Sequence, residues 1–85
     1  MLDVKIASRR NAMAVQLVMD HSGDTRHWYD ATDERSLVEA KERFRQLSEQ
    51  GYTAAVRGTD GSSRIVRSFE PTAEETLFFP RLVGG

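Results

Sequence analysis

The 85-residue sequence has no cysteine, only two prolines, and no apolar run long enough to cross a bilayer. Without cysteine the chain has no disulfide framework, no thiolate nucleophile and no thiolate metal site. A membrane span needs about 20 consecutive apolar residues. The N-terminal stretch carries acidic Asp3 early and no apolar run of signal-peptide length. We therefore expect a cytoplasmic protein with no membrane partner.

The sequence also lacks an excess of charge of one sign. Twelve Lys and Arg residues nearly balance thirteen Asp and Glu residues. Binding to a phosphate backbone depends on a concentrated positive surface, so we expect no nucleic-acid partner. A chain of this length buries roughly 60% of its unfolded surface in one small core, which leaves little room for a deep pocket. We expect a protein that is not an enzyme and holds no cofactor.

Two strands are expected near the N-terminus, in residues 2–8 and 13–20, because apolar and other residues alternate in both. The polar residues between them favour an N-terminal hairpin. In the second strand the alternation separates two sets of side chains. One set is expected in the core and consists of Met13, Val15, Leu17 and Met19; the other consists of Ala14, Gln16 and Val18.

The next segment combines a turn with a lone tryptophan. Residues 21–24, His-Ser-Gly-Asp, have the composition of a turn. Residues 25–29 form either a short strand or a loop, and we expect Trp28 in or over the core, as is common for a lone tryptophan in a small domain. Four potential metal ligands lie close together here, but their spacing matches no defined zinc pattern, so we expect no metal site; they are Asp20, His21, Asp24 and His27.

One amphipathic helix is expected over about residues 33–50. Asp33 and Glu34 supply an N-cap and the negative charge that a helix N-terminus favours. Apolar residues recur at three- and four-residue spacing along one side; they are Leu37, Ala40, Phe44 and Leu47, with Val38 beside them. Charged residues fill the other side and form a solvated face; they are Glu39, Glu42, Arg43, Arg45 and Glu49. Gly51 suits the left-handed position that ends a helix.

Three further strands are expected, in residues 52–58, 63–69 and 76–79. The dipeptide Asp60-Gly61 is typical of a hairpin turn and joins the first two. Pro71 starts a turn in the polar connection before the last strand. That last strand stops at Pro80.

These elements predict an α+β fold. One amphipathic helix packed across a mixed sheet of four to five strands buries both apolar faces. The order of hairpin, helix, hairpin, short turn and final strand matches the ubiquitin-like β-grasp, and a split β-α-β arrangement of the ferredoxin kind is the alternative. We expect a single domain in residues 1–80, followed by a flexible Gly-Gly tail in residues 81–85.

The C-terminal segment, residues 74–85, reads EETLFFPRLVGG. It resembles the C-terminal segment of the MoaD and ThiS sulfur carriers, β-grasp proteins related to ubiquitin. In that family an acidic residue, a short apolar strand and proline precede a terminal Gly-Gly. Arg81 stands where these carriers often have a second proline, and the last five residues are similar to the Arg-Leu-Arg-Gly-Gly of ubiquitin. A bacterial ubiquitin-like modifier is therefore as compatible with this tail as a sulfur carrier.

The resemblance implies that an E1-like adenylyltransferase uses ATP to adenylate the carboxylate of Gly85. The product would be a thiocarboxylate or an amide with a target amine, and Gly84 would give the chain clearance in the enzyme channel. A downstream transferase, an isopeptidase or a target protein would be further partners. The partner-binding residues implied by the resemblance are Phe78, Phe79, Pro80, Arg81, Leu82 and Val83.

A second class of function is compatible with the same fold. The chain would then be a non-catalytic structural, assembly or protein-binding module that works through a β-grasp surface. This hypothesis predicts that the chain tolerates loss of the two terminal glycines. It also predicts sensitivity at an exposed sheet edge or around Trp28.

Overall fold

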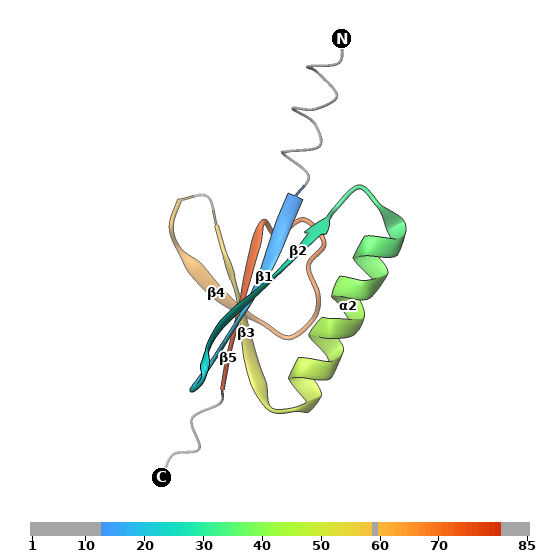
Figure 1. The fold of residues 1–85 in the computed structure, drawn as a ribbon. Helices are drawn as coiled ribbons and strands as arrows, with labels where there is room; N and C mark the ends of the chain where they lie inside the picture. Colours follow the sequence, from blue (N-terminus) through green and yellow to red (C-terminus); the bar gives the residue numbers. More distant parts are fainter. Residues whose placement is uncertain (1–12, 59, 81–85) are drawn as a thin grey trace.

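Five strands and one helix follow one another in residues 13–58 and 60–80, the part of the chain that the computed structural model describes (Figure 1). The domain is α+β, as the sequence predicts. In chain order the elements are β1 (Met13–Asp20), β2 (Gly23–Asp30), α2 (Glu34–Glu49), β3 (Tyr52–Arg57), β4 (Ser63–Val66) and β5 (Glu75–Pro80).

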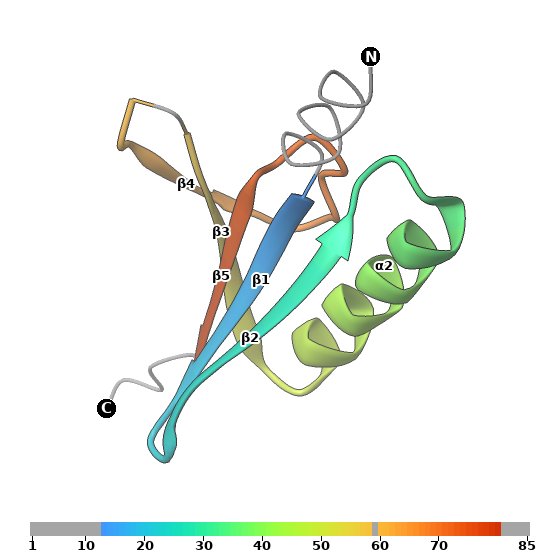
Figure 2. The same ribbon diagram turned by 45° about the horizontal axis from the view of Figure 1, so that its top comes forward.

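The strands form one mixed sheet in the order β2-β1-β5-β3-β4. β5 lies in the centre, parallel to β1 and antiparallel to β3. β2 pairs antiparallel with β1, and β4 pairs antiparallel with β3. α2 packs across one face of this sheet (Figures 1 and 2). The last strand in the sequence is therefore held on both sides by earlier ones.

The N-terminal hairpin differs from the expected one. β1 pairs with β2 on one side and with β5 on the other, so the expected pairing of residues 13–20 with residues 2–8 is wrong. Residues 2–8 lie outside the described residues. The turn explains the choice: Gly23 adopts φ +132°, and the Asp20 carboxylate accepts hydrogen bonds from the Ser22 amide (2.8 Å) and hydroxyl (2.6 Å). Residues 25–29, left open by the sequence, belong to β2.

α2 occupies the range that the sequence predicts. The Asp33 side chain caps it by accepting from the Ser36 amide at 3.0 Å. Gly51 follows its C-terminal end with φ +98°, a conformation that a residue with a Cβ rarely adopts. The expected helix and both of its ends are confirmed.

β4 is shorter than expected, because the chain leaves the sheet after Val66. Phe69 then turns to the helix side, where its ring centroid lies 6.0 Å from that of Tyr29 and 6.2 Å from that of Phe44. Contact of this aromatic side chain with Tyr29 and Phe44 stabilises the excursion.

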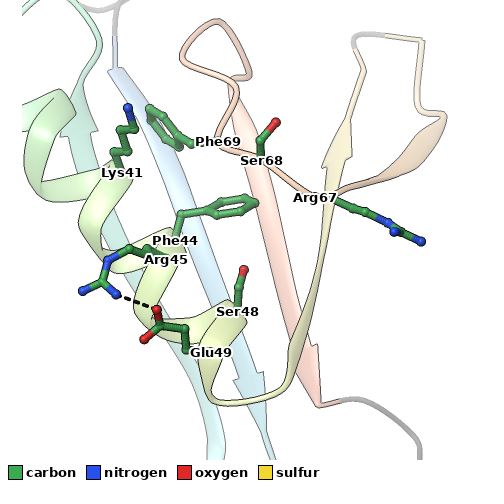
Figure 3. A pocket seen from close by; sticks show the side chains of 8 residues that line it. All are labelled: Lys41, Phe44, Arg45, Ser48, Glu49, Arg67, Ser68 and Phe69. Atoms are coloured by element: carbon green, nitrogen blue, oxygen red, sulfur yellow. Dashed lines mark hydrogen bonds and ion pairs between the residues drawn. The ribbon is translucent and has the colours of Figure 1, made fainter.

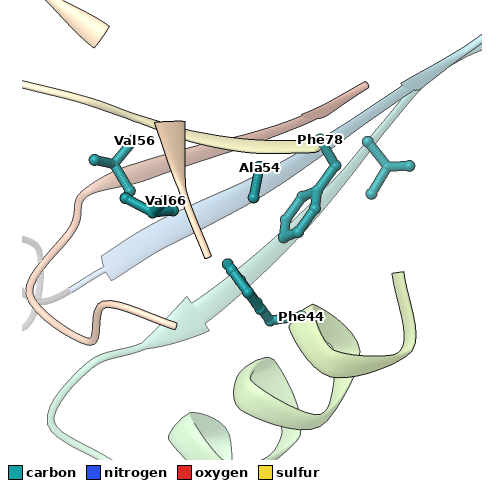
Figure 4. Close-up of a cluster of buried hydrophobic side chains, with 6 residues drawn as sticks. Phe44, Ala54, Val56, Val66 and Phe78 are labelled. Atoms are coloured by element: carbon teal, nitrogen blue, oxygen red, sulfur yellow. The ribbon is translucent and has the colours of Figure 1, made fainter. Parts of the chain in front are cut away.

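The core lies between α2 and the sheet (Figure 4). Phe44 of the helix meets Phe78 of β5 edge to face, with ring centroids 5.4 Å apart. Phe78 is completely buried. The buried cluster around this pair consists of Val18, Phe44, Ala54, Val56, Val66 and Phe78.

The faces of β1 differ in part from the expectation. Ala14, Gln16 and Val18 face the helix and are buried. On the other face Val15 is buried as expected, whereas Met13 is 40% exposed and Leu17 and Met19 are only partly buried. Alternation shows that the two faces of a strand differ, but not which face the helix covers. α2 comes close to β1 at Ala40, which is fully buried in one cluster with Ala14, so this position favours a small side chain.

Gln16 is compatible with this buried position because both its amide nitrogen and its amide oxygen form a hydrogen bond. Its Nε2 donates to the Ala40 carbonyl at 2.9 Å, and its Oε1 accepts from Arg43 at 2.9 Å. Arg43, expected on the solvated face, thus contributes to the contact between helix and sheet.

Replacing Gln16 by alanine is expected to lower the free energy of unfolding by about 1–3 kcal/mol, because it leaves Arg43 without this acceptor and opens a gap beneath the helix. Urea denaturation measures the loss. Gln46→Ala is the control. It removes the same type of side chain from an exposed position of α2 and should change stability by less than about 0.5 kcal/mol. Equal effects of the two substitutions would contradict a structural role for the Gln16 bonds.

Candidate functional site

β5 carries the chain out of the domain at one end of the sheet. Pro80, its last residue, lies opposite Tyr52, the first residue of β3. The turn between β1 and β2 lies at the same end (Figure 2). Pro80 is exposed, so β5 ends at the surface of the domain. The expected tail residues 81–85 lie outside the described residues.

The paired phenylalanines of β5 point to opposite faces. Phe78 faces the helix and is 0% exposed, whereas Phe79 is half-buried on the opposite face. Of the residues expected to contact a partner, Phe78 has no surface to offer, and we assign it to the core. Phe79 and Pro80 have exposed surface beside the point where the tail begins.

The face of the sheet opposite α2, here called the open face, carries an apolar band. Leu17 lies opposite Leu77, Leu77 opposite Ala55, and Ala55 opposite Ile65. The band therefore crosses four strands. Ala55 within it is buried, Leu17 and Leu77 are partly buried, and Ile65 at its end is 59% exposed. α2 lies on the other side of the sheet (Figure 1). The open face is a candidate protein-binding surface.

Trp28 lies on this open face, opposite Val15, and is 61% exposed. Of the two expected places, in the core or over it, the first is wrong. The neighbouring Tyr29 takes the core position, 3% exposed, and donates its hydroxyl to the Ala73 carbonyl at 3.5 Å. Burial raises the pKa of this tyrosine above its ordinary value. Since adjacent strand residues point to opposite faces, burial of Tyr29 directs Trp28 outward.

The two histidines of the N-terminal hairpin lie in different settings. His21 is exposed in the turn, whereas His27 is partly buried on the helix side of β2, opposite Gln16. Burial lowers the pKa of His27 below its ordinary value, and the nearby charge of Arg43 lowers it further. Hydrogen bonds from Ser22 lower the pKa of Asp20. Within residues 13–58 and 60–80, no three His, Asp or Glu side chains are placed to hold a metal ion.

Stability is expected to fall when the pH decreases below about 6.5, the ordinary pKa of histidine. Because His27 has a lower pKa in the folded chain, the unfolded chain binds the proton more readily, so protonation favours unfolding. The urea midpoint should therefore decline as the pH decreases from 7 toward the folded pKa.

His27→Gln removes the titrating group and should flatten this part of the profile, whereas His21→Gln, in the exposed turn, serves as the control. A wild-type midpoint that stays constant over this range would contradict the role given to His27, as would an unchanged slope in the His27 variant.

Comparisons with protein-family models, curated proteins and solved structures found no match. No helix in the described part of the chain is long and apolar enough to span a bilayer.

Proposed function

We propose that this chain is a ubiquitin-like modifier or sulfur carrier with a β-grasp fold, and that its Gly85 carboxylate is the group that reacts. The strand order, with β5 parallel to β1 in the centre and one helix across the sheet, supports the β-grasp assignment. The chain acts as the substrate of an E1-like adenylyltransferase and not as an enzyme.

The observation that carries the proposal is the way β5 leaves the domain. This central strand is anchored by the buried Phe78 and ends at the exposed Pro80, and the sequence continues as Arg-Leu-Val-Gly-Gly. Five extended residues reach roughly 15–18 Å. The carboxylate of Gly85 therefore reaches into a partner's channel while the folded domain stays outside.

Adenylation of the carboxylate explains why two glycines precede it. A carboxylate is a poor electrophile, so its oxygen first attacks the α-phosphate of ATP, releasing pyrophosphate and forming an acyl adenylate. A sulfur nucleophile or an amine then attacks the carbonyl carbon, and AMP leaves. Without a Cβ at residues 84 and 85, the backbone lies close to the channel wall and the carboxylate reaches the phosphate.

A second candidate function is supported by the exposure of Trp28 and Ile65 on the open face. A structural or assembly module would use this apolar surface to bind a protein partner and would not need the terminal glycines. Exposed aromatic side chains of this kind are enriched where proteins bind one another. The two functions predict different results when Gly84 and Gly85 are deleted: a modifier or sulfur carrier loses its function, whereas an assembly module keeps it.

The experiment that tests the first proposal is ATP–pyrophosphate exchange. The full chain is incubated with radiolabelled pyrophosphate, ATP and the E1-like enzyme encoded nearest to its gene. Exchange that depends on the chain supports activation of its carboxylate. No exchange above the rate of the enzyme alone, with any E1-like enzyme of the same genome, contradicts the proposal.

A further inference from the structure

A groove lies between α2, β3, β4 and the segment after β4, and its lining includes Thr53 and Ile65 of the open face. Its first part is a hollow of about 340 Å³ between α2 and the segment after β4 (Figure 3). Its second part, about 540 Å³, lies beside β3 and β4. Ser48 and Arg67 line both parts, so the two hollows adjoin, and together they are called the groove.

The first part of the groove has an aromatic floor. Phe44 and Phe69 line it, with ring centroids 6.2 Å apart and nearly perpendicular planes. Phe44 is buried in the core, whereas Phe69 is only partly buried. An apolar side chain of a partner that lies over these rings removes further aromatic surface from water.

The rim of the groove carries two cations that lack an ion pair within the described residues. Arg45, a third cation at the rim, is held by Glu42 and Glu49 on its own helix. No carboxylate lies within ion-pair distance of Lys41 or Arg67 in the residues that the structure describes. In Figure 3 Lys41 stands beside Phe69, whereas Arg67 extends past the strands, away from the helix. Each part of the groove therefore has a cation available for a carboxylate.

The second part of the groove exposes an open stretch of strand edge. β4 pairs only with residues 54–57 of β3. Tyr52 and Thr53 precede this pairing and line the hollow, so β3 has no β4 partner beside them. An extended peptide is the kind of chain that occupies such an edge.

We propose that this groove binds an extended acidic peptide segment of a partner protein. One aromatic or large aliphatic side chain of the segment lies over Phe44 and Phe69, and its carboxylates lie beside Lys41 and Arg67. Charge complementarity selects an acidic partner over a basic one. This binding does not require activation of Gly85, so it stands independently of the function proposed above.

The test uses the full chain, labelled with ¹⁵N, and an acetylated, amidated peptide of sequence Asp-Glu-Phe-Glu-Asp. Saturable shifts of the backbone amides of residues 41–49, 52–53 and 67–69 are expected in NMR spectra. Two matched peptides serve as controls: Lys-Lys-Phe-Lys-Lys reverses the charge, and Asp-Glu-Gly-Glu-Asp removes the aromatic side chain. Both should bind more weakly by about fivefold or more.

Lys41→Glu is expected to weaken binding of the acidic peptide about fivefold, because an attraction becomes a repulsion. Arg35→Glu makes the same change of charge on the same helix, at an exposed residue that does not line the groove, and should leave binding nearly unchanged. The proposal is overturned if the acidic peptide causes no shifts, if the shifts lie elsewhere, if the basic peptide binds equally well, or if both variants lose affinity equally.

Discussion

Replacing Phe78 by alanine is expected to lower the free energy of unfolding by about 3–5 kcal/mol. This side chain is completely buried in the central strand and packs edge to face against Phe44, so its removal leaves a cavity between helix and sheet. A small domain has a total stability of about 5–15 kcal/mol. The variant should therefore be partly unfolded at physiological temperature.

Phe79→Ala is the matched control, because it removes the same side chain from the next residue of the same strand. Phe79 is half-buried on the open face, and its loss should cost about 1 kcal/mol. Thermal and urea denaturation of the two variants measure the difference. Equal losses would contradict the assignment of Phe78 to the core and Phe79 to the open face.

Deleting Gly84 and Gly85 is expected to reduce activation by the E1-like enzyme at least about 100-fold, while the stability of the domain stays within about 0.5 kcal/mol of the wild type. The deletion withdraws the carboxylate by roughly 7 Å from its place in the enzyme, and a misplacement of far less than this costs about 100-fold in rate. The described core contains no residue beyond Phe78, so folding should not change.

Trp28→Ala separates the two candidate functions. The exposed Trp28 lies on the open face and not in the tail. For a modifier or sulfur carrier this variant keeps its ability to form the adenylate, and only the deletion loses it. Pyrophosphate exchange and urea denaturation of both variants measure the outcome. If the deletion keeps full function in the cell and Trp28→Ala loses it, the assembly module is the better account.

Local sequence features predict where the helix and strands lie in the sequence better than they predict which face of each strand the helix covers. Asp33, Gly51 and the apolar stripe through Phe44 define the helix, because caps and helical periodicity are local properties. The sequence does not show that Gln16 faces the helix, because its burial depends on two bonds, to the Ala40 carbonyl and to Arg43, from a distant element. The expected partner of β1 is wrong for the same reason: one of its two edges is occupied by β5, which is distant in the sequence.

The sequence likewise predicts some features of the candidate site and not others. The Gly-Gly ending and the final strand are recognisable in the sequence as a motif. Which of Phe78 and Phe79 faces the helix is known only once the position of α2 is known. Lys41 reads as one more charge on a solvated helix face. Its position beside Phe69 depends on the chain leaving the sheet after Val66, and no local signal marks that departure.

Tandem mass spectrometry of the C-terminal peptide, after incubation of the full chain with the E1-like enzyme, ATP and a sulfur donor or a target amine, tests the central claim most directly. The account predicts that Gly85 carries the new bond, as a thiocarboxylate or as an amide, and that the rest of the chain is unmodified. An unmodified Gly85 after full turnover of ATP, or a modification on a side chain instead, would contradict it.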